Sequence, residues 1–200
     1  MNELVLGTTN PHKVKEFKDL LQQSYFTLIV LGEAGSPTTI EETGESFEEN
    51  ARLKATIQSK HLNRWVLAED SGLTVTAIDG RPGVFSARYS GQHGDDLSNN
   101  RKLLHELGDL PLKSRAAAFQ CHICVSSPEG IPVIEVSGTC RGIIGFADVG
   151  KDGFGYDPLF FIPEYHKTFS ELGSRIKNTI SHRSIAVRKL LPRLTNLNFT

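Results

Sequence analysis

No run of apolar residues in this sequence approaches the roughly 18 that a membrane-spanning helix requires. The start of the chain also lacks the basic segment and the long apolar stretch of a secretory signal, because Glu3 is acidic and the apolar run at residues 4–6 is short. We therefore expect a cytoplasmic protein that makes no use of a membrane.

A surplus of charge of either sign is missing as well. The 22 Lys and Arg residues nearly balance the 23 Asp and Glu residues, and the net charge is −1. Proteins that bind duplex nucleic acid or anionic membranes through electrostatics carry a clear basic excess. We expect no nucleic-acid partner, and any anionic ligand must be met by local positive charge.

Cysteine is scarce, and the three present form an odd and sparse set for a secreted disulfide scaffold. Cys121 and Cys124 have the CxxC spacing of some metal and redox sites. However, the alternation across residues 118–125 predicts a strand, which places the two sulfurs on opposite faces. Thiols buried in the core are the favoured interpretation, for Cys140 as well.

With 200 residues, of which 38% are hydrophobic, the chain has material for one good core, and we expect a single domain over residues 1–200. Strand patterns alternate irregularly with helical ones and include an apparent hairpin around residues 128–130. This predicts an α/β fold with a mixed sheet flanked by helices. We expect strands at 4–8, 27–31, 65–68, 73–78, 114–126, 132–140 and 158–163, helices after Pro11 and at 45–61, 95–107 and 182–194, a helical turn at 168–172, and a loop at 142–155.

The first polar segment reads Thr8-Thr9-Asn10-Pro11-His12-Lys13 and should lie between a strand and the start of a helix. Its hydroxyls, amide and lysine supply donors for a phosphate group at a helix N-terminus. It is not a Walker loop, because it lacks the glycines and the Gly-Lys-Ser/Thr ending. An ordinary helix cap with a solvated lysine is an equally good interpretation of this segment alone.

Two acidic segments follow, at residues 41–45 with three glutamates and at Glu69-Asp70 after an apolar run. Carboxylate oxygens suit Mg²⁺, which takes a few of them together with waters and substrate phosphates. A solvated turn is the alternative for either segment. Asp70 is harder to explain in that way, since a carboxylate buried behind residues 66–68 needs a partner. A metal ion or a catalytic proton transfer would provide one.

The last polar residues combine aromatic rings with donors. Phe154-Gly155-Tyr156-Asp157 offers rings on which a base can stack, and Lys177, His182 and Arg183 offer hydrogen bonds. The alternative is that the rings belong to the core and the basic residues cap a helix. Taken separately, each segment favours that alternative.

Taken together, six ordered segments resemble the inosine triphosphate pyrophosphatase family, also called the Ham1-like or RdgB-like non-standard purine nucleotide pyrophosphatases. They cover nearly the whole chain, at residues 8–13, 41–44 with 47–51, 70–73, 83–89, 153–158 and 180–183. The resemblance implies an elongated α/β fold of two lobes around a central cleft, assembled as a homodimer. It also implies Mg²⁺-dependent hydrolysis of ITP, dITP and XTP to the monophosphate and pyrophosphate, which keeps these nucleotides out of DNA and RNA.

The resemblance also implies roles for individual residues. Asp70 corresponds to the proton acceptor and metal ligand, Glu42 to a second metal ligand and Ser71 to a substrate contact. Thr9 stands where the family commonly has glycine, which adopts backbone angles that threonine resists. The implied phosphate-binding loop is Thr8, Thr9, Asn10, Pro11, His12 and Lys13, and the implied nucleotide contacts are Phe154, Gly155, Tyr156, Asp157, Lys177, His182 and Arg183.

Selectivity for deaminated purines requires a donor to the oxygen at position six, from His182, Arg183 or a backbone amide, because adenine carries an amino group there. Two other functions remain open on the residues. One is a Maf-like pyrophosphatase of pyrimidine or methylated nucleotides, which the segments at 154–157 and 181–183 disfavour. The other is a nucleotide-binding module without catalysis, which the retained carboxylates around Asp70 disfavour.

Overall fold

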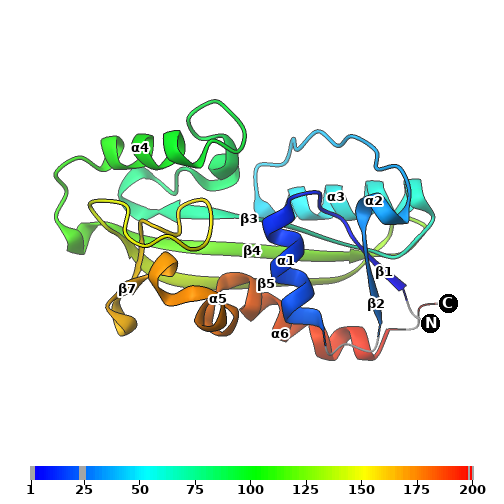
Figure 1. Cartoon of the computed structure of the whole chain (residues 1–200). Coiled ribbons are helices and arrows are strands. Elements are labelled where there is room, and N and C mark those ends of the chain that lie inside the picture. Colours follow the sequence, from blue (N-terminus) through cyan, green and yellow to red (C-terminus); the bar gives the residue numbers. More distant parts are fainter. Residues whose placement is uncertain (1–2, 23–25, 198, 200) are drawn as a thin grey trace. The chain divides into compact units, whose positions relative to one another are not determined.

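The computed structural model describes residues 3–22, 26–197 and 199. The chain folds as two compact units (Figure 1). Unit 1 comprises residues 1–70, 121–138 and 183–200, and unit 2 comprises residues 71–120 and 139–182. The single domain expected over residues 1–200, the elongated shape and the central cleft stay predictions.

One sheet contains all seven strands assigned in the described chain. In spatial order they are β2 (Thr27–Val30), β1 (Glu3–Leu6), β3 (Val66–Val75), β4 (Ala116–Ser126), β5 (Pro132–Ile144), β6 (Phe160–Ile162) and β7 (Lys167–Thr168).

The sheet is mixed, because β1 pairs in parallel with β2 and β3, whereas β6 pairs antiparallel with β5 and β7. Helices accompany the strands in both units, which confirms the predicted α/β class. Unit 1 holds α1 (Pro11–Leu21), α2 (Leu31–Ala34), α3 (Phe47–Leu62) and, except for its first residue, α6 (His182–Thr195); unit 2 holds α4 (Asp96–Leu107), α5 (Phe169–Ile180) and the 3₁₀ turns η1 (Thr76–Ile78), η2 (Gly83–Arg88), η3 (Leu112–Ser114) and η4 (Pro163–Tyr165).

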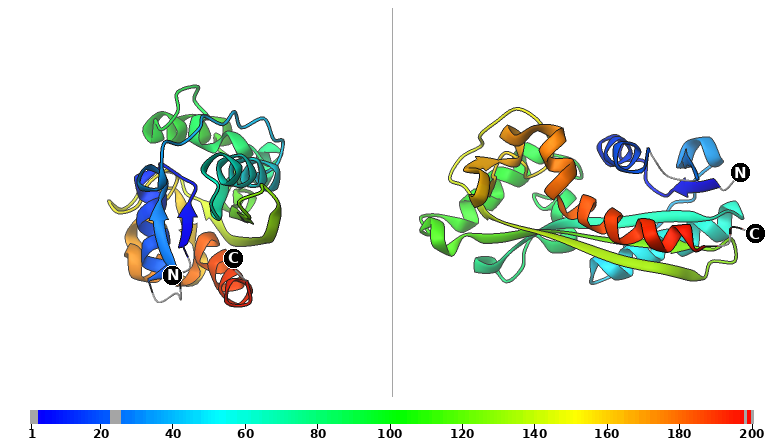
Figure 2. Two further views of the ribbon diagram at one scale, coloured as in Figure 1. Left: turned by 90° about the vertical axis from the view of Figure 1, so that its right-hand side faces the viewer. Right: turned by 90° about the horizontal axis from the view of Figure 1, so that it is seen from below.

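The strands of unit 1 carry a helix layer on each face. In β3, Leu67 packs with α1 and α6, whereas its neighbours Val66 and Ala68 pack with α2 and α3. This follows from the alternation of side chains along a strand. Figure 2 shows α6 running along the strands on the side opposite α3. Successive residues of β3 therefore face different helices.

The core of unit 2 is rich in aromatic rings. The Phe119 ring lies 4.6 Å from that of Phe160, and the Phe160 ring lies 5.1 Å from that of Phe169, between centroids. From α4, Leu103 and Leu107 are buried in the same cluster. This packing fixes α4 and α5, the two helices that hold the aromatic segment described below.

The acidic segment at residues 69–72 differs from its prediction. We expected an apolar strand to end at Ala68 and a new one to begin at Leu73, but β3 runs unbroken from Val66 to Val75. Glu69 and Asp70 are nearly as buried as their apolar neighbours, at 2% and 6% exposure. Their charges are matched by partners from distant segments, so the strand does not have to end where its apolar pattern does.

Two other boundaries also differ. β5 continues to Ile144, so the expected loop at 142–155 begins later. The expected turn at 168–172 is the start of α5, which continues beyond Gly173 to Ile180. Gly173 has non-helical backbone angles, φ +70 and ψ 168, which glycine adopts without a steric penalty, so the expected turn does end there and α5 consists of two helical stretches that meet at a kink.

The three cysteines are free and buried, as expected of core thiols. Cys121 belongs to the cluster with α1 and α6, whereas Cys124 belongs to the cluster with α2 and α3, so the two sulfurs lie on opposite faces. Among the described residues, no helix combines the length and the apolar character needed to cross a bilayer.

Candidate active site

The segment at residues 8–13 is a structured cap at the start of α1. The Asn10 side-chain oxygen accepts hydrogen bonds from the amides of His12, at 3.0 Å, and Lys13, at 3.3 Å. The Asn10 amide in turn donates to the Thr8 hydroxyl oxygen at 3.2 Å. Thr9 is exposed and is not among the residues with positive φ, so threonine takes the place of glycine without left-handed strain.

From this segment Lys13 reaches a buried carboxylate in unit 1. Its Nζ lies 2.7 Å from Oε1 of Glu69, and Nη2 of Arg183 lies 3.2 Å from the same oxygen. Arg183, which is 1% exposed, also pairs with Glu16 of α1. Burial alone would raise the pKa of Glu69, but Arg183 and Lys13 outweigh it and hold that pKa well below its usual range. Glu69 is therefore an anion around which two cations are fixed.

A second carboxylate group in unit 1 surrounds Lys54 of α3. The Lys54 Nζ lies 2.7 Å from Oδ1 of Asp70 and 3.4 Å from Oε1 of Glu42. Asn50, one helical turn earlier, donates to the other Asp70 oxygen at 3.4 Å. Its own side-chain oxygen accepts the Gly44 amide at 2.8 Å, which ties the acidic loop to the same helix. The two carboxylates predicted to bind metal thus converge in the structure.

The electrostatics of this group suit proton transfer at Asp70. Burial raises the pKa of Asp70, and the nearby Lys54 and Lys13 offset this only in part. Burial lowers the pKa of Lys54, but Asp70 and Glu42 outweigh it, so the lysine stays charged with a pKa above its usual value. A carboxylate with a raised pKa, held beside a fixed cation, is a stronger base than an ordinary surface aspartate.

The donor set also fits a divalent cation. Asp70 and Glu42 come from β3 and from the loop before α3, and both already direct an oxygen at one positive charge, the Lys54 ammonium. Two convergent hard oxygen donors are what Mg²⁺ takes from a protein when waters and phosphates complete its shell. These two residues are therefore the ones that would hold the ion.

Glu69 was expected only as a carboxylate of the acidic segment beside Asp70, and two other members of these groups, Lys54 and Asn50, were given no role from the sequence. For the last two the signal was the spacing of four residues on α3, which places them on one helix face. The partners of Glu69, Lys13 and Arg183, lie 56 and 114 residues away along the chain, so no local pattern reveals them.

In unit 2, the predicted aromatic segment is wrapped around a buried ion pair. The Asp157 Oδ2 accepts from the Lys177 ammonium at 2.6 Å and from the Phe154 amide at 3.0 Å. The same ammonium lies 4.6 Å from the centroid of the Phe154 ring. A Cβ at Gly153 would stand 2.2 Å from Asp157 Oδ2, and φ there is +87, so only glycine fits. Lys177, Asp157 and Phe154 thus form one rigid group.

The remaining predicted residues are placed separately. Tyr156 is buried and donates its hydroxyl to the Ser86 carbonyl at 2.9 Å. The His182 ring stacks on Phe119, with centroids 4.9 Å apart, so it belongs to unit 2 while its neighbour Arg183 joins the Glu69 group of unit 1. Ser71 is half-buried and follows Asp70 in β3.

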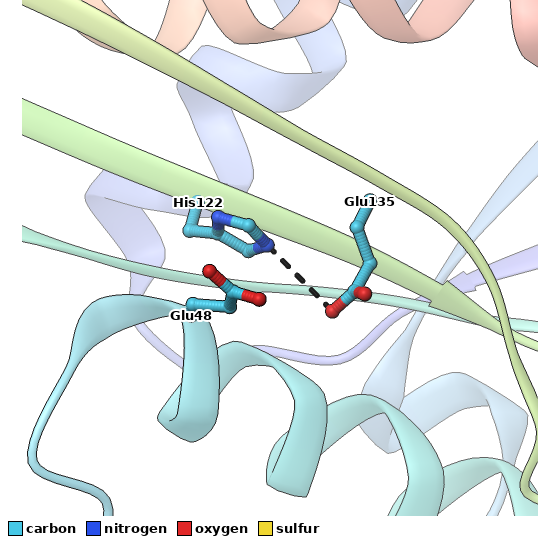
Figure 3. A group of neighbouring side chains, drawn as sticks. All are labelled: Glu48, His122 and Glu135. Carbon is cyan, nitrogen blue, oxygen red and sulfur yellow. Dashed lines mark ion pairs between the residues drawn. The ribbon is translucent and has the colours of Figure 1, made fainter.

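A further group in unit 1 resembles a metal site in composition. Glu48, His122 and Glu135 offer ligand atoms within 4.8 Å of one another (Figure 3). Arg52 already pairs with both glutamates, at 2.8 Å from Glu48 Oε1 and 2.9 Å from Glu135 Oε1. Because a guanidinium stays protonated, the two carboxylates already share a permanent positive charge. We interpret the group as an ion-pair cluster that joins α3 to the β4–β5 hairpin.

Unit 2 also contains an open cavity of about 360 Å³. Its polar side chains come from Thr74, Thr76, Arg141 and Glu164, and the rest of its lining consists of the alanines at 116–118 of β4 together with Gly142 and Pro163. None of the residues predicted for catalysis or binding lines it, so it is separate from the groups above.

Known proteins resemble this chain over nearly its whole length. Residues 4–193 match the sequence model of the Ham1 family. A dITP/XTP pyrophosphatase of Rhodopirellula baltica is 53% identical over 197 residues, which are 98% of this chain and 95% of that protein. The dITP/XTP pyrophosphatase of Bacillus subtilis is 45% identical over 95% of this chain and 96% of its own length. The structure of a HAM1 protein from Coxiella burnetii superposes with a TM-score of 0.89 at 39% identity, covering 98% of this chain and 100% of that one.

Proposed function

We infer that this chain, which belongs to the Ham1 family, is a pyrophosphatase of non-standard purine nucleoside triphosphates. It hydrolyses deaminated purine nucleotides such as dITP, ITP and XTP to the monophosphate and pyrophosphate, and so removes them before they enter DNA or RNA. The observation that carries this conclusion is the pair of carboxylates, Asp70 and Glu42, that converge on Lys54. The 53% identity to a dITP/XTP pyrophosphatase supports it.

Hydrolysis of a phosphoanhydride needs an oriented water, a proton acceptor and positive charge near the phosphate oxygens. Asp70 accepts the proton, because burial raises the pKa of its carboxylate. Lys54 and Asn50 hold that carboxylate by its two oxygens. Lys13 and the capped start of α1 supply positive potential for phosphate oxygens.

The proposed cofactor is Mg²⁺, held by Asp70 and Glu42. When bound, it neutralises charge that develops on the phosphate oxygens. The support is the convergence of these two carboxylates on one positive charge.

For the base, we propose Phe154 as the stacking surface and the segment Gly155, Tyr156 and Asp157 with Lys177 as its support. The Lys177 ammonium under the ring and the Asp157 carboxylate beneath the Phe154 amide hold the ring in place. The donor to the oxygen at position six stays assigned to His182, Arg183 or a backbone amide. Ser71 is proposed as a further substrate contact, and a cytoplasmic homodimer is proposed on family resemblance.

The test is pyrophosphate release from ITP, dITP, XTP, ATP, GTP and the pyrimidine triphosphates, each with and without Mg²⁺. We expect turnover of ITP, dITP and XTP that needs the metal and is lost in Asp70→Asn. Preference for a pyrimidine triphosphate would replace this function with the Maf-like one. Binding without pyrophosphate release would replace it with a binding module.

A further inference from the structure

Helix α4 holds the aromatic segment of unit 2 by its main chain. The Gly155 amide donates a hydrogen bond to Oδ2 of Asp96 at 2.6 Å. The Gly155 carbonyl accepts one from Nδ2 of Asn100 at 3.2 Å. Both backbone groups of a single residue are therefore bound by two side chains of one helix.

The sequence of α4 explains how it presents these two groups. Asp96 is the first residue of the helix and Asn100 is the fifth, so they lie one above the other on the same face. The positive end of the helix dipole stabilises a carboxylate at Asp96. Asn100 is 4% exposed and donates its amide also to the Asp148 carboxylate at 3.4 Å, so a backbone carbonyl and a carboxylate together set its orientation.

These two hydrogen bonds fix two peptide planes. In a trans peptide the N–H and the C=O point in opposite directions, and the bonds on either side of Gly155 are not among the cis bonds of the described chain. Asp96 therefore orients the peptide between Phe154 and Gly155, and Asn100 orients the peptide between Gly155 and Tyr156. Gly155 has φ +62, so it turns the chain between the two planes in a way that most other residues resist.

We call the hydrogen bonds from Gly155 to Asp96 and from Asn100 to Gly155 the clamp. The clamp acts on the part of the segment that a nucleotide can reach. Tyr156 and Asp157 are buried, whereas Phe154 and Gly155 are only half-buried. The orientation of the two planes decides where the Phe154 ring stands and which backbone donors and acceptors lie beside it. Because rejection of a wrong base depends on such donors being aligned, a small rotation of these planes changes selectivity more than it changes chemistry.

We propose that Asp96, assisted by Asn100, is a positioning residue that sets the purine selectivity of this enzyme. The proposal rests on the pyrophosphatase function above and deepens it. Asp96 contacts the Gly155 main chain and not the nucleotide, so it belongs neither to the metal site nor to the proton-transfer group.

The experiment compares Asp96→Ala with wild type, using kcat and KM for ITP, GTP and ATP with saturating Mg²⁺. We expect KM for ITP to rise about tenfold, the size of effect that loss of one hydrogen bond to a charged group produces. We expect kcat for ITP to stay within about threefold, because uniform binding is lost and not a transition-state contact. The ratio of kcat/KM for ITP to that for ATP should fall severalfold, because adenine is the base that the aligned donors reject.

Asp95→Ala is the matched control. Asp95 caps the same helix, with Oδ1 accepting the Ser98 amide at 3.0 Å, and it has no hydrogen bond to Gly155 among those described. Its loss weakens the start of α4 without releasing the clamp, so melting temperature should fall while the ITP to ATP ratio stays at the wild-type value. Asp96→Asn retains an acceptor oxygen and should restore most of the ratio.

The selectivity ratio is measured within one preparation, so a lower folded fraction cancels from it. An unchanged ratio in Asp96→Ala, or an equal fall in Asp95→Ala, would overturn the proposal and leave Asp96 a structural residue. Failure of the wild-type enzyme to hydrolyse ITP would instead refute the proposed function. The two failures are therefore distinguishable.

Discussion

Unit 1 and unit 2 hold their predicted site residues by different means. In unit 1, Glu69 and Asp70 are buried charges, and each is balanced by lysine or arginine side chains. In unit 2, the aromatic segment is held mainly through its main chain, by Asp96, Asn100 and Asp157. Loss of one buried charge leaves its partners uncompensated, whereas loss of one clamp changes only an orientation. Changes in unit 1 should therefore cost stability or turnover, and changes in unit 2 affinity or selectivity.

The largest expected effect is on folding. Glu69→Gln leaves Lys13 and Arg183 without their shared anion, and breaking a buried pair by removing one partner costs about 3–5 kcal/mol. The free energy of unfolding at pH 7, from urea denaturation without divalent metal, measures this loss. A change below about 1 kcal/mol would contradict the role of Glu69 as the centre of the group.

The same variant has a defined pH dependence. The folded-state pKa of Glu69 lies below its ordinary value of 4.5, so its stabilisation is fully present above that pH and is lost as pH falls toward the folded-state pKa. The stability difference between wild type and Glu69→Gln should therefore be constant near neutrality and shrink below about pH 4.5. A difference that grows in acid would show the opposite sign of shift.

Next in size is the loss of turnover in Asp70→Asn. The amide cannot accept the proton of the attacking water, and kcat for ITP should fall by about 10² or more. Melting temperature serves as the control, since the variant also removes a buried charge with a raised pKa. Near-normal kcat in a folded variant would remove Asp70 from the proton-transfer step.

A smaller effect on turnover is expected for Lys54→Met, which keeps the length of the side chain and removes its charge. Asp70 then loses a partner at 2.7 Å, and we expect kcat to fall about tenfold. Lys60→Met, an exposed position on the same helix, is the control and should have wild-type kcat. If Lys54→Met matches that control at saturating Mg²⁺, the lysine only occupies the place of the metal.

The smallest effect should come from Tyr156→Phe in unit 2. It removes the hydrogen bond to the Ser86 carbonyl and costs about 1 kcal/mol of stability. Activity toward ITP should change less than threefold, because the clamp on Gly155 remains. A loss of selectivity as large as that of Asp96→Ala would mean that the whole segment, and not the clamp, sets the orientation.

The sequence predicted those parts of the fold that depend on local signals. Asn10 and Pro11 mark the start of α1, because a cap acts within a few residues, and the helix expected from residue 45 begins close by, at Phe47. The continuous β3 was not predictable in this way. Polar residues in the middle of a strand normally indicate a loop, and the partners that allow their burial come from other elements.

The candidate site was predictable as a set of residues but not as two groups. Motif resemblance supplied Asp70, Glu42, Lys177 and Asp157, all of which have charged partners in the structure. It did not reveal that His182 and Arg183, adjacent in sequence, belong to different units. It also gave no signal for Asp96, whose partner is a backbone amide, since any residue carries one.

The unbroken course of β3 has a consequence for changes in chain length. Glu69 and Asp70 are neighbours with opposite protonation behaviour, because one is directed toward α1 and α6 and the other toward α3. Inserting or deleting a single residue just before them would turn each toward the other's surroundings. A substitution in this strand changes one side chain only. A one-residue change of register would instead exchange the positions of Glu69, the structural anion, and Asp70, the proton acceptor. Engineering of this strand should therefore use replacements that keep the number of residues unchanged.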